Sequence, residues 1–305
     1  MAGALDCADR SGDASRIVLT FECPMPELPE VETVVRGLQS ALPGRRIVEV
    51  RLGKRDFIED PAAIERELPG SRISAVRRHG KFIVFDLQTK NGANERGTLL
   101  IHLGMTGQIL TCEPQRPIAS HTHVFFSLDD GREMRYTDIR RFGKIRLLRN
   151  GTGEGALGGL GLDPTEAGEH EFIARLAGRR ARVKALLLDQ HVLRGMGNIY
   201  TDESLWRAHI HPRRLGANLS KGELHRLYQA VRCVLAEAIR LRGSSISDYV
   251  DAEGNRGEFQ LRHRVYQREG EKCVRCRSEI RREIVAGRSS YFCPRCQRPP
   301  RKRSN

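Results

Sequence analysis

Residues 25–44 read MPELPEVETVVRGLQSALPG, and the organisation of the first half of the 305-residue chain follows from this segment. Apolar residues recur at helical spacing from Val31 to Leu42, and Pro43-Gly44 ends the run. We therefore predict a helix over Pro29–Leu42, with the proline in its first turn. Beyond residue 44 the apolar period changes to two, which indicates strands.

The strands predicted by this period of two are separated by Gly, Pro and Asp. They are Ile47–Leu52, Ile73–Val76, Phe82–Leu87, Leu99–Leu103, Val124–Leu128 and Lys144–Leu148. Residues 25–150 should therefore form a β-sandwich, or a flattened barrel, with one N-terminal helix. The fold class that we expect for the whole chain is α+β.

The second half has a helical pattern. We expect a Gly-rich linker over 151–168, a helix–two-turn–helix domain over 169–264, a zinc hairpin over 265–297 and a basic tail over 298–305. The predicted helices are Glu169–Ala177, Val183–Leu188, Asn198–Ala208, Lys221–Leu241 and a short piece near Ile246–Val250. Gly153-x-Gly155-x-x-Gly158 matches a dinucleotide-binding pattern but opens no helix, so we expect no nucleotide cofactor.

Charge is unevenly distributed. Residues 1–150 carry 23 Lys and Arg against 20 Asp and Glu, whereas the remainder carries 29 against 18. Such a basic C-terminal half favours a polyanionic partner, of which nucleic acid is the commonest. No segment approaches the ~20 apolar residues of a membrane span, so we expect no membrane partner and a cytoplasmic location. Residues 1–24 contain four acidic residues and do not resemble a signal peptide.

Four of the eight cysteines form two C-x-x-C pairs. Cys273 and Cys276 are separated by 16 residues from Cys293 and Cys296, a spacing typical of a tetrahedral zinc site on a hairpin. One structural Zn²⁺ would stabilise a module too small to have its own core. Arg288 lies between the pairs and should reach furthest from the hairpin.

Three further segments carry candidate nucleic-acid contacts. In Leu188–Tyr200, two glycines permit tight turns and Asn198 should cap the next helix, leaving amides for a phosphate. Tyr136–Gly143 contains Arg-Arg-Phe, which together with Met105 could form a wedge that enters a base stack, or a sheet turn with core side chains. Arg77–Lys81 is either a solvated basic turn or a phosphate contact through its lysine.

If translation starts at Met25 and that residue is removed, Pro26 becomes the first residue and carries a secondary amine. An α-amino group titrates at about pH 7.7–8.0, so a useful fraction is neutral and nucleophilic. Glu27 lies beside this nitrogen and Glu30 one helical turn further on, which places carboxylates for proton transfer nearby.

Taken together, these segments resemble formamidopyrimidine-DNA glycosylase, a bacterial base-excision repair enzyme for oxidised purines. The resemblance covers roughly residues 25–297 and rests on six motifs in order: PELPEVET, RRHGKF, HLGMTG, YTDIRRFG, GMGNIY and the cysteine hairpin. It implies duplex DNA containing oxidised bases as the partner and a monomeric glycosylase/AP lyase. It also implies that loop 243–260 closes over the extruded base.

The resemblance implies roles for individual residues. Pro26 matches the Schiff-base nucleophile, Glu27 the acid/base beside it and Glu30 a supporting residue. Lys81 matches the lysine of β-elimination and phosphate contact, and Arg288 the hairpin arginine of δ-elimination. The gap-filling residues would be Met105, Arg140 and Phe142, and the DNA contacts His121, Arg140, Arg179, Lys184 and Asn198.

The chain departs from the family pattern in three places. With residues 1–24 attached, the Pro26 nitrogen is an amide and cannot form an imine. We interpret these residues as an over-extended start or a disordered extension; the other interpretation is a processed or inactive form. Arg277 and Gln267 stand where the family usually has glycine, which affects hairpin geometry.

Two alternative functions stay open. An endonuclease VIII-type glycosylase for oxidised pyrimidines would have the same fold, although Leu28, the gap-filling set and the long 243–260 loop favour the purine enzyme. A non-catalytic zinc-dependent DNA-binding protein is the outcome if the N-terminal extension persists.

Overall fold

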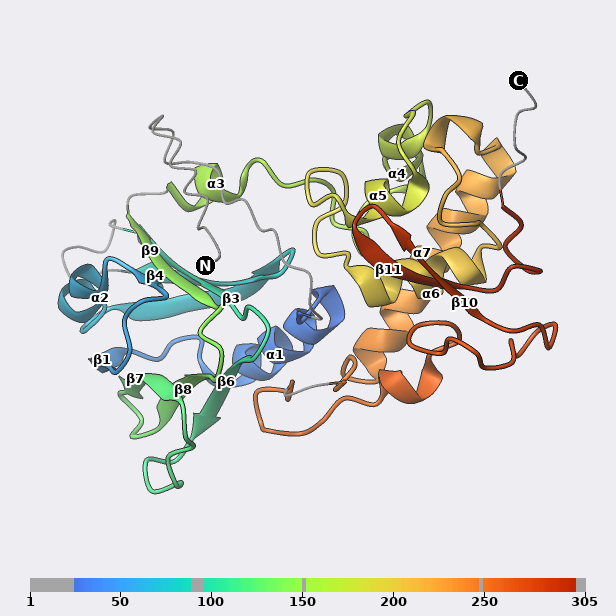
Figure 1. Ribbon diagram of the computed structural model, residues 1–305. Coiled ribbons are helices and arrows are strands. Elements are labelled where there is room, and N and C mark those ends of the chain that lie inside the picture. Colours follow the sequence, from blue (N-terminus) through green and yellow to red (C-terminus); the bar gives the residue numbers. More distant parts are fainter. Residues whose placement is uncertain (1–24, 89–95, 150–151, 247–248, 300–305) are drawn as a thin grey trace, which may run out of the picture.

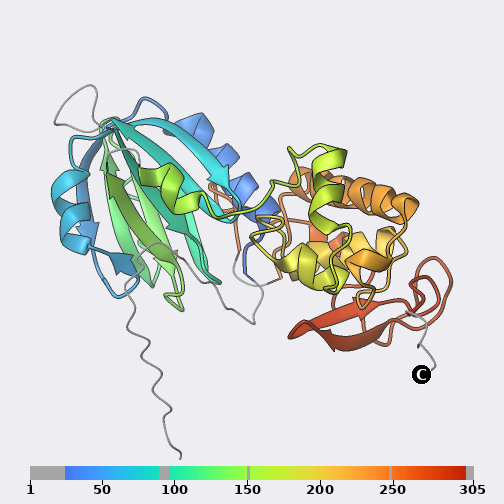
Figure 2. The same ribbon diagram turned by 90° about the horizontal axis from the view of Figure 1, so that it is seen from above.

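The computed structural model describes residues 25–88, 96–149, 152–246 and 249–299, which form two lobes (Figure 1). The predicted extension over 1–24 and most of the tail lie outside the described residues. In the N-terminal lobe two sheets face each other, and in the C-terminal lobe helices carry a two-stranded hairpin on one side (Figures 1 and 2).

The N-terminal lobe contains a four-stranded and a five-stranded sheet. The first has the order β1 (Ile47–Leu52), β7 (Thr122–Leu128), β8 (Glu133–Asp138), β6 (Gly107–Cys112), with antiparallel neighbours. The second has the order β2 (Ile58–Glu59), β9 (Lys144–Arg149), β5 (Arg96–His102), β4 (Phe82–Gln88), β3 (Arg72–His79), and only its β2–β9 pair is parallel.

A single hydrophobic core joins both sheets, which confirms the predicted sandwich. Phe126 of one sheet and Phe85 of the other are fully buried in it, together with Val34 and Leu38 of helix α1 (Leu28–Ala41). The predicted single helix is wrong, because α2 (Pro61–Glu67) follows β2 and is capped by the Asp60 side chain. Strands β6 and β8 were also not predicted.

Helix α1 belongs to both lobes. Its first residue, Leu28, packs in the core of the C-terminal lobe, whereas Val31 and the residues that follow pack in the sandwich core. The helix lies at the junction of the lobes, with its N-terminal end directed toward the C-terminal lobe (Figure 2). The PELPEVET segment therefore sits where both domains meet.

The C-terminal lobe contains the helices that the sequence predicts, to within one residue at each end. They are α4 (Glu169–Leu176), α5 (Val183–Leu188), α6 (Asn198–Arg207) and α7 (Lys221–Arg240), with short 3-10 turns η1 (Gly216–Asn218) and η2 (Phe259–Arg262). The helical piece expected near Ile246–Val250 is wrong at its described positions, since Ile246, Tyr249 and Val250 are not helical. The Ser245 hydroxyl instead donates a hydrogen bond to the Tyr249 carbonyl.

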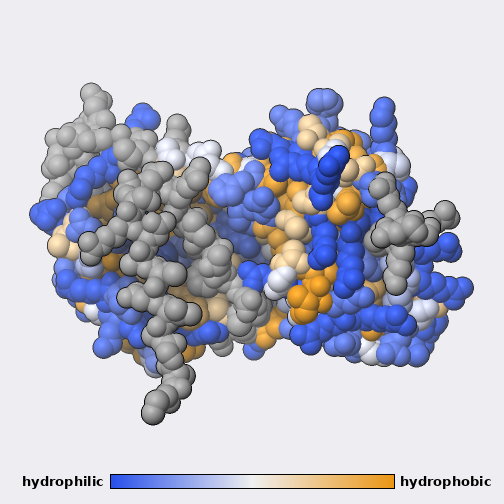
Figure 3. Space-filling view, turned by 45° about the horizontal axis from the view of Figure 1, so that its top comes forward, coloured by the Kyte–Doolittle hydropathy of each residue, from blue (hydrophilic) through white to orange (hydrophobic). Residues whose placement is uncertain are grey.

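The linker and the hairpin complete the chain. Helix α3 (Thr152–Leu157) interrupts the segment that was expected to be an irregular linker. Strands β10 (Arg281–Val285) and β11 (Arg288–Phe292) pair in antiparallel register, with Arg288 opposite Val285 at the turn. No helix among the described residues has the length and apolar character that a membrane span needs. Hydrophilic residues make up most of the coloured surface in Figure 3, and hydrophobic ones form a broken band on the C-terminal lobe.

Candidate active site

The candidate site begins at the first turn of α1, where Pro26 and Glu27 are buried. The Glu27 amide donates a 2.9 Å hydrogen bond to Glu30 Oε2, so the first turn is closed by its own side chain. In the 305-residue chain the Pro26 nitrogen is bonded to residue 25. Chemistry at this nitrogen therefore requires a chain that begins at Pro26.

The Glu27 side chain reaches across the junction to the N-terminal end of α6. Its carboxylate accepts hydrogen bonds from the Ile199 amide (3.0 Å) and the Tyr200 amide (3.4 Å). These amides carry the positive end of the helix dipole, which suits a carboxylate. Gly197 makes the approach possible, since a Cβ there would overlap the Glu27 carboxyl group.

This contact corrects two predictions for the 188–200 turn. The α6 amides that were expected to hold a phosphate hold the Glu27 carboxylate instead. Asn198 does not cap the helix: Gly197 occupies the N-cap position, and Asn198 Nδ2 donates to the Ser289 carbonyl (2.9 Å). The N-terminal end of α6 does bind an acidic group, as predicted, but this group is the Glu27 carboxylate of the same chain.

Glu30 is fully enclosed between the lobes. Its carboxylate accepts from the Tyr200 hydroxyl, from the Ser244 amide (2.7 Å) and from the Glu27 amide. The Tyr249 hydroxyl donates to the Glu30 backbone carbonyl (3.2 Å). The described parts of loop 243–260 on either side of residues 247–248 are thus attached to this one residue; residues 247–248 lie outside the described part.

Lys81 completes the charged cluster. It is 8% exposed and lies in the turn between β3 and β4, close enough to Glu27, Glu30 and Arg288 for their charges to act on it. Gly80 has a positive φ of 61° and packs against Arg194 of the 188–200 turn. A glycine suits both the backbone conformation and the close approach there.

Burial shifts the proton equilibria of this cluster. Burial raises the pKa of Glu27, although Lys81 and the α6 amides oppose the shift. Burial, followed by the charge of Glu27, raises the pKa of Glu30 to about 7. Burial lowers the pKa of Lys81, against the attraction of the two carboxylates. Such displaced acids and amines are typical of proton-transfer sites.

Arg288 is brought to the cluster by contacts that hold β11 against α6. Asp202 accepts from Lys184 Nζ (2.7 Å) and from the Tyr291 amide (2.9 Å), and Lys184 Nζ also donates to the Ser289 carbonyl (2.8 Å). Lys184 is 0% exposed. The direct DNA contact expected for Lys184 does not fit this geometry, because its ammonium group is enclosed by protein acceptors.

The gap-filling residues lie on two adjacent turns of the N-terminal lobe. The exposed Arg140 guanidinium lies 4.6 Å from the centre of the Phe142 ring, and the Arg140 amide donates to Thr106 Oγ1 (3.0 Å). Met105 is only 6% exposed, so it is presently a buried side chain and not a projecting wedge. A Cβ at Gly104 would overlap the Phe142 backbone, which shows how closely the two turns approach.

The two remaining DNA-contact candidates are exposed. His121 has a positive φ of 65° at the start of β7, and Arg179 lies between α4 and α5. Sequence reasoning missed Tyr200, Asp202 and Tyr249 as parts of the site. No local signal marks them, since they act only after the two lobes have come together.

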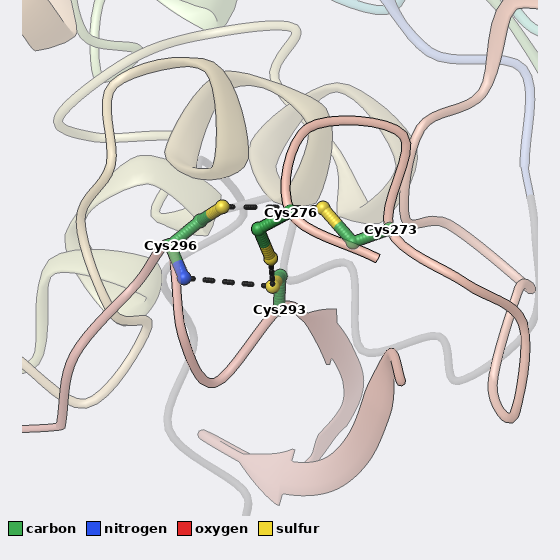
Figure 4. A group of neighbouring side chains, drawn as sticks. All are labelled: Cys273, Cys276, Cys293 and Cys296. Carbon is green, nitrogen blue, oxygen red and sulfur yellow. Dashed lines mark hydrogen bonds between the residues drawn. The ribbon is translucent and has the colours of Figure 1, made fainter. Parts of the chain in front are cut away.

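The four cysteines converge at the base of the hairpin (Figure 4). Their sulfur atoms lie within 4.8 Å of one another, with Cys276 and Cys293 at 3.4 Å and Cys273 and Cys296 at 3.9 Å. Tetrahedral Zn–S bonds of roughly 2.3 Å place sulfur atoms slightly under ~4 Å apart. The residues therefore fit a single zinc ion.

Family models match the chain in three blocks. The formamidopyrimidine-DNA glycosylase N-terminal domain matches residues 25–145, its H2TH domain residues 160–250, and the zinc finger found in FPG and IleRS residues 270–299. Formamidopyrimidine-DNA glycosylase of Pelotomaculum thermopropionicum is 43% identical over 280 residues, which cover 90% of this chain and 99% of that protein. The chain belongs to the formamidopyrimidine-DNA glycosylase family.

Other members of the formamidopyrimidine-DNA glycosylase family agree with this assignment. The Solibacter usitatus protein is 46% identical over 276 residues, 90% of this chain and all of that protein. Lactococcus lactis Fpg bound to DNA containing an abasic site superimposes with a TM-score of 0.81 at 32% identity, covering 90% of this chain and 100% of that one. The structure of a point mutant of the Lactococcus protein with Fapy-dG-containing DNA superimposes with a TM-score of 0.81 at 33% identity. It also covers 90% of this chain and 100% of that one.

Membership makes the chain an enzyme, a DNA glycosylase of a family with AP lyase activity. The formamidopyrimidine-DNA glycosylase zinc finger coincides with the four-cysteine cluster, so the single metal site expected from the C-x-x-C pairs is confirmed. Cys273, Cys276, Cys293 and Cys296 would hold the ion. They offer no open coordination position, which is the character of a structural site.

Proposed function

We propose that this enzyme removes oxidised purines, 8-oxoguanine and formamidopyrimidines, from duplex DNA and then cuts the strand by β,δ-elimination. One observation carries the proposal: Pro26 and Glu27 lie at a lobe junction that also gathers Glu30, Lys81 and Arg288. A nucleophilic nitrogen, a carboxyl group of raised pKa and two cations are the groups that this chemistry needs.

The reaction starts with the Pro26 amine in a chain that begins at this residue. Its nitrogen, having released its proton, attacks C1′ of a nucleotide that has been flipped out of the duplex, since C1′ is otherwise unreachable. The C1′–N9 bond breaks and the base leaves with the electron pair and a proton. The nitrogen then loses its remaining proton, the C1′–O4′ bond breaks as O4′ takes up a proton, and nitrogen and C1′ are left joined as an iminium ion.

Elimination follows from the iminium. It acidifies the C2′ proton, and removal of this proton breaks the C3′–O bond; a second elimination breaks the C5′–O bond, and water releases Pro26. Glu27, anchored by the α6 amides, is the proton-transfer group beside the nitrogen. Lys81 and Arg288 stabilise the phosphates that leave in the two eliminations. A zinc ion bound by the four cysteines would stabilise the hairpin that carries Arg288.

The test is borohydride trapping on a duplex that contains one 8-oxoguanine. A protein beginning at Pro26, made from a Met25 start, should give a covalent adduct, whereas the 305-residue form should give none. This outcome would identify Pro26 as the nucleophile and residues 1–24 as dispensable. Absence of an adduct with either form would overturn the mechanism.

The lesion class needs its own measurement. We expect excision of 8-oxoguanine opposite cytosine to be well above excision of thymine glycol. The reverse ratio would assign the chain to the oxidised-pyrimidine function instead.

A further inference from the structure

Trp206, the single tryptophan of the chain, lies beside the cysteine cluster. It occupies the last turn of α6, is 6% exposed and packs with Val265, Ile280 and the two fully buried ligands Cys273 and Cys293. Trp206 is thus a contact between the C-terminal end of α6 and the metal site, and the N-terminal end of the same helix anchors Glu27.

The indole N–H of Trp206 is buried and has no hydrogen-bond partner in the described part of the chain. A buried donor without an acceptor costs free energy on the order of 1–3 kcal/mol, so such groups are rare. The group that it faces is the Cys273 sulfur, toward which the Arg275 and Cys276 backbone amides are also directed. A metal-bound cysteine is a thiolate and accepts such hydrogen bonds better than a thiol does.

Arg275 covers the face of the indole. Its guanidinium carbon lies 3.6 Å from the ring centre, and its Nη1 donates to the Trp206 carbonyl (2.8 Å) and contacts His209 Nε2 (3.0 Å). Four thiolates around Zn²⁺ leave two net negative charges. A cation fixed on the indole, two residues from Cys273, opposes this charge.

We propose that Trp206 is a positioning residue for the zinc ion: its indole N–H donates to the Cys273 thiolate, and its face fixes Arg275 beside the cluster. The pair retains the metal and joins the zinc hairpin to α6. Groups of this kind, which contact the ligands and not the metal, typically change metal affinity by about 10–100-fold.

The direct test is NMR of ¹⁵N-labelled protein in which ¹¹³Cd replaces zinc. A hydrogen bond from Trp206 to the metal-bound sulfur should give scalar coupling between the indole proton and cadmium. The single tryptophan makes the assignment unambiguous. An indole proton without coupling, exchanging with solvent at the rate of an exposed tryptophan, would overturn the proposal.

The second test is the rate of zinc transfer to a chromophoric chelator. Trp206→Phe keeps an aromatic ring but removes the N–H, and we expect zinc release at least about tenfold faster. Tyr228→Phe is the matched control, because it removes a ring-borne donor (to the Ala167 carbonyl, 3.3 Å) in the same lobe, away from the cysteines. Equal release from both folded variants and the wild type would show that Trp206 only fills space.

Discussion

The Glu27 carboxylate and the Ile199 amide nitrogen lie 3.0 Å apart, although 172 residues separate them in the chain. This hydrogen bond joins the first turn of the sandwich helix to the first turn of α6 in the helix–two-turn–helix domain. The acid of the site is therefore oriented by the opposite lobe. Its geometry depends on how the two lobes meet, and residues at the contact should matter as much as the acid itself.

Gly197 is the residue that tests this dependence. A methyl group added there would overlap the Glu27 carboxyl group, so Gly197→Ala should displace it from the α6 amides. A displacement of about 1 Å at a reacting group lowers rates roughly 100-fold, and we expect a loss of this size in single-turnover base excision. Gly168→Ala is the control, because a methyl group there meets no atom within 4 Å. A Gly197→Ala enzyme with the wild-type rate would contradict the anchoring role.

Local sequence pattern was sufficient for most of the elements but not for their junction. The helix over Pro29–Leu42 and the strand over Ile47–Leu52 show clear periods of 3.6 and two, and both formed as expected. Strand β8 was missed because its buried residues include Glu133 and Arg135, which are paired with each other and look like a surface loop in sequence.

For the site, too, the sequence predicted what depends on residues close together in the chain and missed the contacts between distant segments. Spacing alone identified the four cysteines, because metal ligands are close in sequence. It could not show that Lys184 would be enclosed, since the carboxylate and the carbonyl that enclose it come from α6 and β11. Asn198 was expected at a helix cap from its residue type, whereas a glutamate from the other lobe holds the amides there.

The raised pKa of Glu30 predicts a pH dependence of stability. Burial raises this pKa to about 7 from an unfolded value of 4.5, so the folded protein retains a proton that the unfolded chain releases. The stabilising contribution is complete below pH 4.5 and is lost as the pH rises to about 7. The unfolding free energy of the wild type should therefore fall across this window by up to about 3 kcal/mol relative to Glu30→Gln.

Urea unfolding of the wild type and of Glu30→Gln at several pH values measures this difference in free energy. The exposed Glu171→Gln is the control, and a parallel pH profile for Glu30→Gln and wild type would refute the shift.

The enclosed ion pair between Lys184 and Asp202 predicts a large asymmetry between single and double variants. Lys184→Met leaves the buried Asp202 carboxylate with only the Tyr291 amide, and such a loss costs about 3–5 kcal/mol of unfolding free energy. Lys184→Met with Asp202→Leu removes both charges and should recover much of this loss. Denaturant unfolding gives both values, with the exposed Lys221→Met as control. A single variant that loses less than about 1 kcal/mol would mean that the pair is not isolated from water.

Arg140 and Arg179 should affect DNA binding in different ways if their positions reflect their proposed roles. Arg140 is exposed over the Phe142 ring at the turn that would enter the base stack, so Arg140→Ala should weaken discrimination between lesion-containing and undamaged duplexes. Arg179 is exposed between two helices of the basic lobe, so Arg179→Ala should lower affinity for every duplex and reduce the slope of log K against log salt by about one.

Fluorescence anisotropy with both duplexes over a range of salt concentrations separates these two effects, because a phosphate contact changes the salt slope and a wedge changes the ratio of the two affinities. The 305-residue form and the form that begins at Pro26 should give the same ratio for each variant, since neither arginine lies at the nitrogen. If both substitutions weaken binding to undamaged DNA equally and leave the ratio unchanged, Arg140 acts as a phosphate contact and the wedge role is wrong.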